Sequence, residues 1–166
     1  MTDGAKRHTI SALVENRPGV LTRISGLFSR RGFNIESLTV GETHDPQLSR
    51  MTIVVSGDDI VLEQVAKQLN KLVDVVKVSD ISDTQTVSRE LVFVKVKAGA
   101  ETRGEIMQIV SIFRGQIIDL SEKSLIVELT GDEDKTGAMI QLLSRFGIIE
   151  VVRTGKVSLC RGSQTT

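Results

Sequence analysis

Two short stretches decide the fold and the candidate site: Glu15-Asn16-Arg17-Pro18-Gly19-Val20-Leu21 and Gly32-Phe33-Asn34-Ile35-Glu36-Ser37. The first is typical of a strand that enters a tight loop and then the N-terminus of a helix. The second is typical of a helix that ends at glycine and is followed by a new strand. One asparagine stands at each junction. We expect this arrangement to hold a small zwitterion.

The residues around the first stretch indicate a strand followed by a helix. Residues 8–15 alternate, with Ile10, Ala12 and Val14 on one face, which is the period of a strand. Residues 18–31 carry apolar side chains at the spacing of one helix face, namely Val20, Ile24, Leu27 and Phe28. Pro18 is expected in the first helical turn, and Gly32 is expected to end the helix in the left-handed conformation.

The next residues complete a repeating unit. Residues 34–42 and 48–56 are rich in Ile, Val and Thr and are expected to form a hairpin around His44-Asp45-Pro46-Gln47. Asp58 is expected to cap a helix, and its apolar stripe is predicted from Val61, Val65, Leu69 and Leu72. Residues 73–81 return as a strand. The predicted order is therefore βαββαβ.

The same order recurs after a polar stretch. The expected elements are strand 89–97, helix 102–113, strands 116–121 and 125–130, helix 132–146 and strand 148–159. Both halves place Gly-Asp before the second helix, at Gly57-Asp58 and Gly131-Asp132. We therefore predict a first domain over 1–82, a linker over 83–88 and a second domain over 89–166.

A βαββαβ unit of this size is predicted to fold as an α+β, ferredoxin-like sheet with both helices on one face, because right-handed crossovers leave few alternatives. Strand 34–42 would then be one edge of its sheet. It contains no proline, and Glu36 and Glu42 are its only charges. Since an unblocked edge strand invites pairing, we expect two chains to form a homodimer through it.

Composition argues against several classes of partner. The 21 basic residues balance 21 acidic ones, and no block of like charge is long enough for nucleic acid or a membrane surface. The single cysteine, Cys160, excludes an intramolecular disulfide and suits a reducing compartment. No apolar run approaches the ~20 residues of a membrane span, and residues 1–9 lack the apolar region of a secretory signal. A cytoplasmic location is expected.

The sequence offers little for catalysis. His8 and His44 are the only histidines, and both are expected on the solvated surface. The glycines match no phosphate-binding loop, and no metal-ligand spacing is present. Ser25 lacks the flanking glycines of a nucleophile elbow. We therefore expect no catalytic residue and no metal on this chain.

The loop before the first helix has chemistry suited to a ligand. The first N–H groups of a helix have no intrahelical acceptor, and the positive end of the helix dipole attracts a carboxylate. Gly19 permits close backbone approach, an asparagine carbonyl can accept from an ammonium group, and Val20 and Leu21 are expected to line an apolar wall. The residues alone leave a simpler alternative open, in which Asn16 is a helix cap and Gly19 and Asn34 are turn residues.

The chain resembles the regulatory (small) subunit of acetolactate synthase, also called acetohydroxyacid synthase. The resemblance covers nearly the whole chain and is most specific over residues 31–40. The segments that carry it are Val14-Glu15-Asn16-Arg17-Pro18-Gly19-Val20-Leu21, Leu27-Phe28-Ser29-Arg30-Arg31-Gly32-Phe33-Asn34-Ile35-Glu36-Ser37-Leu38-Thr39-Val40, Leu48-Ser49-Arg50-Met51-Thr52-Ile53, Lys67-Gln68-Leu69-Asn70-Lys71-Leu72-Val73-Asp74-Val75 and Phe113-Arg114-Gly115-Gln116-Ile117-Ile118-Asp119.

This resemblance implies an N-terminal ACT domain and a C-terminal ferredoxin-like domain in a subunit with no reaction of its own. Such subunits bind and activate the large catalytic subunit and confer feedback inhibition by a branched-chain amino acid, usually valine. The catalytic subunit, and not this chain, carries thiamine diphosphate, magnesium and FAD.

The resemblance also implies where the amino acid binds, at the interface of two ACT domains. The residues that it assigns are Asn16, Pro18, Gly19, Val20 and Leu21 of one chain with Asn34 and Ile35 of the other. The family varies at Arg17-Pro18, so the choice among valine, leucine and isoleucine stays open.

Two other functions are alternatives. A free-standing ACT-type sensor could act on another enzyme or on transcription, because fold alone does not fix function. No helix-turn-helix segment or basic recognition helix supports a role in transcription. A small enzyme would need a nucleophile or metal site that the sequence lacks. The second domain, whose helix begins near Thr102 without an Asn/Pro/Gly loop, is assigned to assembly or activation.

Overall fold

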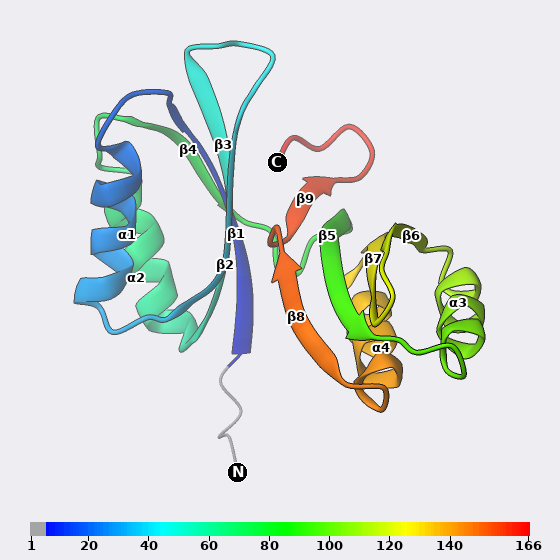
Figure 1. The fold of residues 1–166 in the computed structure, drawn as a ribbon. Helices are drawn as coiled ribbons and strands as arrows, with labels where there is room; N and C mark the ends of the chain where they lie inside the picture. Colours follow the sequence, from blue (N-terminus) through cyan, green and yellow to red (C-terminus); the bar gives the residue numbers. More distant parts are fainter. Residues whose placement is uncertain (1–5) are drawn as a thin grey trace. The chain divides into compact units, whose positions relative to one another are not determined.

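The computed structural model describes residues 6–166 and divides the chain into two compact units. The first unit comprises residues up to 87 together with 156–166, and the second comprises residues 88–155. Each unit is built on its own antiparallel sheet (Figure 1). No helix within residues 6–166 is long and apolar enough to cross a membrane.

The first unit has the predicted βαββαβ order. Its elements are β1 (Lys6–Glu15), α1 (Val20–Arg30), β2 (Ile35–Glu42), β3 (Leu48–Gly57), α2 (Asp59–Leu69) and β4 (Val75–Asp80). The strands lie in the order β2-β3-β1-β4, and all neighbours are antiparallel. Helices α1 and α2 lie side by side on one face of this sheet (Figure 1). The expectation that the second strand forms an edge is confirmed.

The core of the first unit lies between this sheet and its two helices. Val20, Ile24 and Phe28 of α1 are buried, as the helical stripe predicts, and Ile10, Ala12 and Val14 of β1 face them in the same cluster. The ring of Phe28 meets that of Phe33 edge-on, with centroids 6.3 Å apart. In α2 the buried residues are Leu62, Val65 and Leu69. The predicted stripe is therefore wrong at Val61, which is only half-buried, and at Leu72, which lies beyond the end of the helix.

The second unit repeats this fold. Its elements are β5 (Thr86–Lys97), α3 (Arg103–Ile112), β6 (Gln116–Leu120), β7 (Ser124–Gly131), α4 (Glu133–Ser144) and β8 (Ile148–Arg153). The strand order β6-β7-β5-β8 corresponds position by position to that of the first sheet. The predicted fold class, two ferredoxin-like α+β units, is confirmed.

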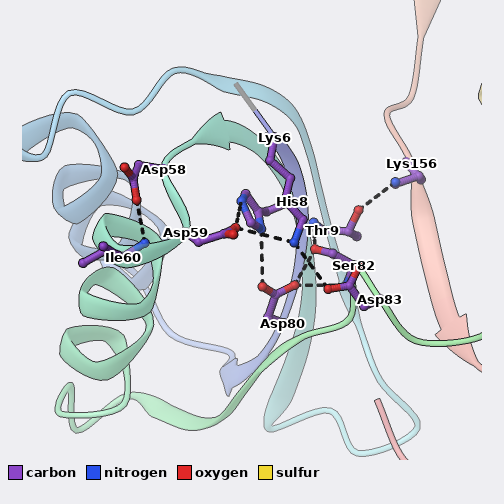
Figure 2. Close-up of polar contacts among 10 residues, drawn as sticks. All are labelled: Lys6, His8, Thr9, Asp58, Asp59, Ile60, Asp80, Ser82, Asp83 and Lys156. Atoms are coloured by element: carbon purple, nitrogen blue, oxygen red, sulfur yellow. Dashed lines mark hydrogen bonds and ion pairs between the residues drawn. The ribbon is translucent and has the colours of Figure 1, made fainter. Parts of the chain in front are cut away.

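The helix ends follow the sequence signals with one exception. Asp58 caps α2 by accepting a hydrogen bond from the N–H of Ile60 at 2.7 Å (Figure 2). Gly32 has φ 75° just after α1, as expected for a glycine that ends a helix. The prediction that Pro18 opens the first turn is wrong. Gly19 is the N-cap with φ 85°, and the helix begins at Val20.

The boundaries between the units also differ from the expected ones. Strand β5 begins at Thr86, inside the predicted linker 83–88. The predicted strand 148–159 is interrupted at Gly155, where φ is 90°, and resumes as β9 (Val157–Cys160). Residues 156–166 group with the first unit and hydrogen-bond to its sheet, for example from Lys156 Nζ to Thr9 Oγ1 at 2.8 Å (Figure 2). Strand β9 itself pairs with β5.

Candidate functional site

The loop between β1 and α1 presents an open helix N-terminus. Gly19 occupies the N-cap position, no side chain of residues 6–166 caps it, and its carbonyl accepts the N–H of Arg23 at 3.1 Å. The N–H groups of the first turn precede the first intrahelical bond and carry the positive end of the helix dipole. This end of α1 is therefore suited to a carboxylate.

Asn16 fixes the loop to the β2–β3 turn. Its backbone N–H donates to Gln47 O at 2.8 Å, and its Nδ2 donates to Pro46 O at 3.0 Å and to Glu42 Oε2 at 3.3 Å. Asn16 is therefore not the cap of α1. The simpler alternative, in which Asn16 caps this helix, is wrong on this point. A groove of about 490 Å³ lies here, lined by Glu15, Asn16, Arg17, Pro46, Gln47 and Leu48.

A cationic side chain that the sequence analysis missed lies over the loop. Arg23 binds Asp74 through Nε at 2.8 Å and through Nη2 at 2.6 Å. Its Nη1 lies 3.4 Å from the position that a Cβ on Gly19 would occupy. The carboxylate of Asp74 thus orients the guanidinium beside the helix N-terminus. The spacing of Arg23 four residues after Gly19 was the available signal, since residues i and i+4 share a helix face.

The two apolar residues of the loop have different environments. Val20 is only 4% exposed and packs in the core, so its side chain cannot line a ligand wall as expected. Only its backbone N–H remains available at the helix end. Leu21 is 46% exposed, and its role in an apolar wall stays a prediction. Pro18 and Gly19 are also exposed.

Asn34 and Ile35 lie at the opposite end of α1. The preceding Phe33 packs so closely over Gly57 that a Cβ there would approach its ring to 1.9 Å, which fixes the chain before Asn34. A groove of about 470 Å³ runs along this end of the helix and is lined by Thr22, Ser25, Gly26, Ser29, Phe33, Asn34 and Ile35. The 11 residues of α1 span about 16 Å at 1.5 Å each. One chain therefore does not bring the loop and Asn34 together.

The two histidines differ in environment. His44 is exposed, as expected, whereas the expectation for His8 is wrong. The side chain of His8 is 2% exposed, with Nε2 3.1 Å from Asp59 Oδ1 and Nδ1 3.4 Å from Asp80 Oδ2 (Figure 2). Neither contact has hydrogen-bond geometry. They lie between β1, α2 and β4, at the end of β1 opposite to the loop.

The geometry of the first unit is that of an ACT domain. A model of the "AHAS small subunit-like ACT domain" family matches residues 10–77. A second model, "Small subunit of acetolactate synthase", matches residues 89–162. Together the two models cover most of the chain, so the class of both units is defined.

Individual relatives agree along the whole chain. The chain is 58% identical to the probable acetolactate synthase small subunit of Archaeoglobus fulgidus, over 95% of this chain and 99% of the relative. It is 51% identical to the acetolactate synthase small subunit of Mycolicibacterium smegmatis, over 98% and 95%. The crystal structure of the small subunit from Thermotoga maritima superposes with a TM-score of 0.86 at 46% identity, over 96% and 99%. The chain belongs to the acetolactate synthase small-subunit family.

Membership of this family sets the coarse function. The chain is a regulatory subunit that contains an ACT domain, and a small subunit implies a larger catalytic partner. The resemblance to this family is therefore confirmed.

Proposed function

We propose that this chain activates the catalytic subunit of acetolactate synthase and makes it sensitive to feedback inhibition by a branched-chain amino acid, with valine as the first candidate. The amino acid binds at the interface of two ACT domains in a homodimer. Thiamine diphosphate, magnesium and FAD belong to the catalytic subunit. The observation that carries the proposal is the separation of the two sets of candidate residues at opposite ends of α1.

An antiparallel dimer would unite these two sets. Strands β1 and β2 are both antiparallel to β3, so they run in the same direction. The end of β2 at Glu42 therefore lies beside the loop, and Asn16 Nδ2 is 3.3 Å from Glu42 Oε2. Two β2 edges paired about a two-fold axis place the start of one strand beside the end of the other. Asn34 and Ile35 of a second copy then face the loop of the first.

Each part of valine has a matching group in this arrangement. The carboxylate binds the N–H groups at the start of α1, with Nη1 of Arg23 beside them. The ammonium group is held by asparagine oxygens, since Asn16 uses its Nδ2 for Pro46 and Glu42. The isopropyl group packs on Leu21 and on Ile35 of the second copy. Val20 contributes its N–H and not its side chain.

Inhibition requires valine to bind two states of the holoenzyme unequally, because a ligand without a preference shifts no equilibrium. Reversing a population from 1:99 to 99:1 takes about 5.5 kcal/mol of differential affinity. Two sites per dimer, each with ~1–3 kcal/mol of coupling, give inhibition that is substantial but incomplete.

Mixed dimers test the shared site directly. Gly19→Asp and Asn34→Ala homodimers are both expected to lose valine binding in isothermal titration and valine inhibition in the reconstituted holoenzyme, while activation is retained. A mixed dimer carries both defects in one site and leaves the other site intact. Co-refolding the two insensitive variants should therefore restore titratable sites.

Two results decide against the proposal. If the site lies within one chain, mixing the variants restores nothing. If the holoenzyme with either homodimeric variant is still fully inhibited by millimolar valine, the site assignment is wrong. Titration of the unmodified chain with valine, leucine and isoleucine in turn identifies the preferred amino acid.

A further inference from the structure

The last residues of the chain contact every strand of the first sheet. We name residues 156–166 the C-terminal segment. Lys156 donates from Nζ to Thr9 Oγ1 of β1 at 2.8 Å and from its backbone N to Ser37 Oγ of β2 at 2.9 Å. Arg50 of β3 donates from Nη1 to Thr166 O at 3.0 Å. Lys77 of β4 donates from Nζ to Thr165 Oγ1 at 3.0 Å. The segment is therefore part of the ACT unit and not a free tail.

Lys156 makes the most specific of these contacts. The hydroxyl of Ser37 accepts its N–H, and the hydroxyl of Thr39 donates to its carbonyl at 3.1 Å. Both peptide groups of one residue are thus satisfied by two side chains of β2. The side-chain ammonium group adds the contact to Thr9, which Figure 2 shows. Any shift of β2 at Ser37 or Thr39 must move Lys156 or break these bonds.

The contacted part of β2 follows directly on the candidate ligand residues. Asn34 and Ile35 stand at the start of the strand, and the pairing of β2 with β3 shifts register between Ile35 and Ser37. Such a bulge leaves one residue outside the regular pairing and re-aims the side chains beside it. The start of β2 is therefore less tightly held to β3 than the remainder, and Ser37 is the first residue beyond the shift.

Lys156 also follows directly on the second unit, whose last residue is Gly155. Two chain connections join the units, at 87/88 and at 155/156. Arg161 of the C-terminal segment holds the approach to the first connection through N to Gln85 O at 2.8 Å and Nε to Thr86 O at 3.2 Å. A displacement of the C-terminal segment can therefore reach the second unit in two ways. At 155/156 the segment is covalently joined to that unit, and near 87/88 it is hydrogen-bonded to the residues that lead into it.

We propose that Ser37, Thr39 and Lys156 form a coupling contact through which occupation of the amino-acid site at Asn34 and Ile35 reaches the second unit. This inference rests on the proposed function. It requires the contact to differ between the amino-acid-bound and free states, since coupling exists only where two states are biased unequally. Ser37 and Thr39 are positioning residues here, outside the amino-acid site itself.

The test separates binding from its consequence. In Ser37→Ala/Thr39→Val both hydroxyls are absent and the strand is kept. The matched control Ser37→Thr/Thr39→Ser keeps both hydroxyls in the same two positions. For each full-length chain, the valine dissociation constant is measured by titration, and valine inhibition is measured in the reconstituted holoenzyme.

We expect the first variant to bind valine with an affinity within about threefold of the unmodified chain. The coupling between valine binding and inhibition should weaken by about tenfold, which lies within the 5- to 150-fold range typical of allosteric coupling. The control should keep both properties. In amide exchange, valine should change the protection of the Lys156 N–H in the unmodified chain and in the control, but not in the first variant.

Four outcomes contradict the inference and are distinguishable. If valine neither binds nor inhibits with the unmodified chain, the proposed function fails and this inference fails with it. If the unmodified chain responds and the first variant is inhibited equally well, only the coupling contact is wrong. Loss of valine binding together with inhibition would assign the hydroxyls a structural role alone. Failure of the control along with the first variant would show that the hydroxyls are not the cause.

Discussion

The two units share a fold in detail. In the first, the pairing of the second and third strands shifts register between Ile35 and Ser37, and in the second it shifts between Ile117 and Asp119. The pairing of the first and fourth strands shifts at Leu13/Val14 in one unit and at Lys95/Val96 in the other. Bulges at corresponding places show that the repeat extends to local irregularities and not only to strand order.

The units differ where the first strand enters the first helix. Gly19 caps α1 in the left-handed region, whereas Thr102 precedes α3 in a right-handed conformation. The hydroxyl of Thr102 accepts the N–H of Gly99 at 3.1 Å, which ties the second loop to itself. A groove of about 700 Å³ lies beside this loop, with Phe146 and Ile149 among its walls. The open helix N-terminus on which the proposed amino-acid site depends is therefore a feature of the first unit, and the assignment of the second unit to assembly or activation stays a prediction.

The largest expected effect concerns one phenylalanine in each unit. Phe28 is fully buried in α1, and Phe113, at the C-cap of α3, is only partly buried. Phe28→Ala should destabilise its unit by about 3–5 kcal/mol, because a large buried side chain is lost. Phe113→Ala should cost clearly less. Chemical denaturation, with amide exchange as the readout in each unit, measures the loss of unfolding free energy in both variants. Equal losses would contradict the difference in burial.

The next effect concerns the two loop glycines. Gly19→Asp should weaken valine binding by more than about 100-fold, since two anions about 4 Å apart near a protein surface repel by about 4 kcal/mol. The backbone at Gly19, with φ 85°, adds strain for any other residue. Gly99→Asp is the matched control, because a Cβ there meets nothing within 4 Å. Titration should show the control binding valine normally, and a comparable loss in both would remove the distinction between the loops.

A smaller effect should be alike in the two units. Asp58 caps α2 through Ile60, and Asp132 caps α4 by accepting the N–H of Lys135 at 2.9 Å. Each change to alanine should cost about 1 kcal/mol, the usual value for a lost N-cap. Denaturant midpoints measure both, with Asp58→Asn and Asp132→Asn as conservative controls. A cost confined to one unit would show that the repeat does not extend to its caps.

The smallest effect is confined to α2. The Lys67 ammonium group, hydrogen-bonded to Glu63 at 2.8 Å, lowers the pKa of the Glu63 carboxyl. A lowered pKa in the folded state means that the contribution to stability is present above the unfolded-state pKa and is lost as pH falls through the folded one. Carbon-detected NMR titration should show the Glu63 pKa returning upward in Lys67→Met. No change in that variant would exclude the pair as its cause.

The confirmed predictions rest on local patterns. The strand and helix periods gave both βαββαβ orders, the spacing of Val20, Ile24 and Phe28 gave the core face of α1, and Gly32 marked its end. The wrong prediction for the Val20 side chain conflicts with that same core stripe. A side chain that faces the sheet cannot also line an exterior wall.

The remaining errors involve contacts between distant residues. His8 is buried because Asp59 and Asp80, which follow it by more than fifty residues, close around it. The C-terminal segment belongs to the first unit because it meets residues such as Thr9 and Arg50, more than one hundred positions earlier. Periodicity within a window of fifteen residues carries no information on such pairs. The distance between Asn34 and the loop likewise follows from the length of α1 in the folded chain, and not from a local sequence pattern.

The return of the chain to its first sheet changes how the protein should be dissected. A fragment that stops at residue 87 would lack the partners of Ser37, Thr39, Arg50 and Lys77 in the C-terminal segment. Gln85 and Arg161 are already joined by a backbone hydrogen bond of 2.8 Å. A short glycine bridge in place of residues 88–155 would keep the C-terminal segment in a fragment of the first unit, but it would remove most of β5, the strand with which β9 pairs.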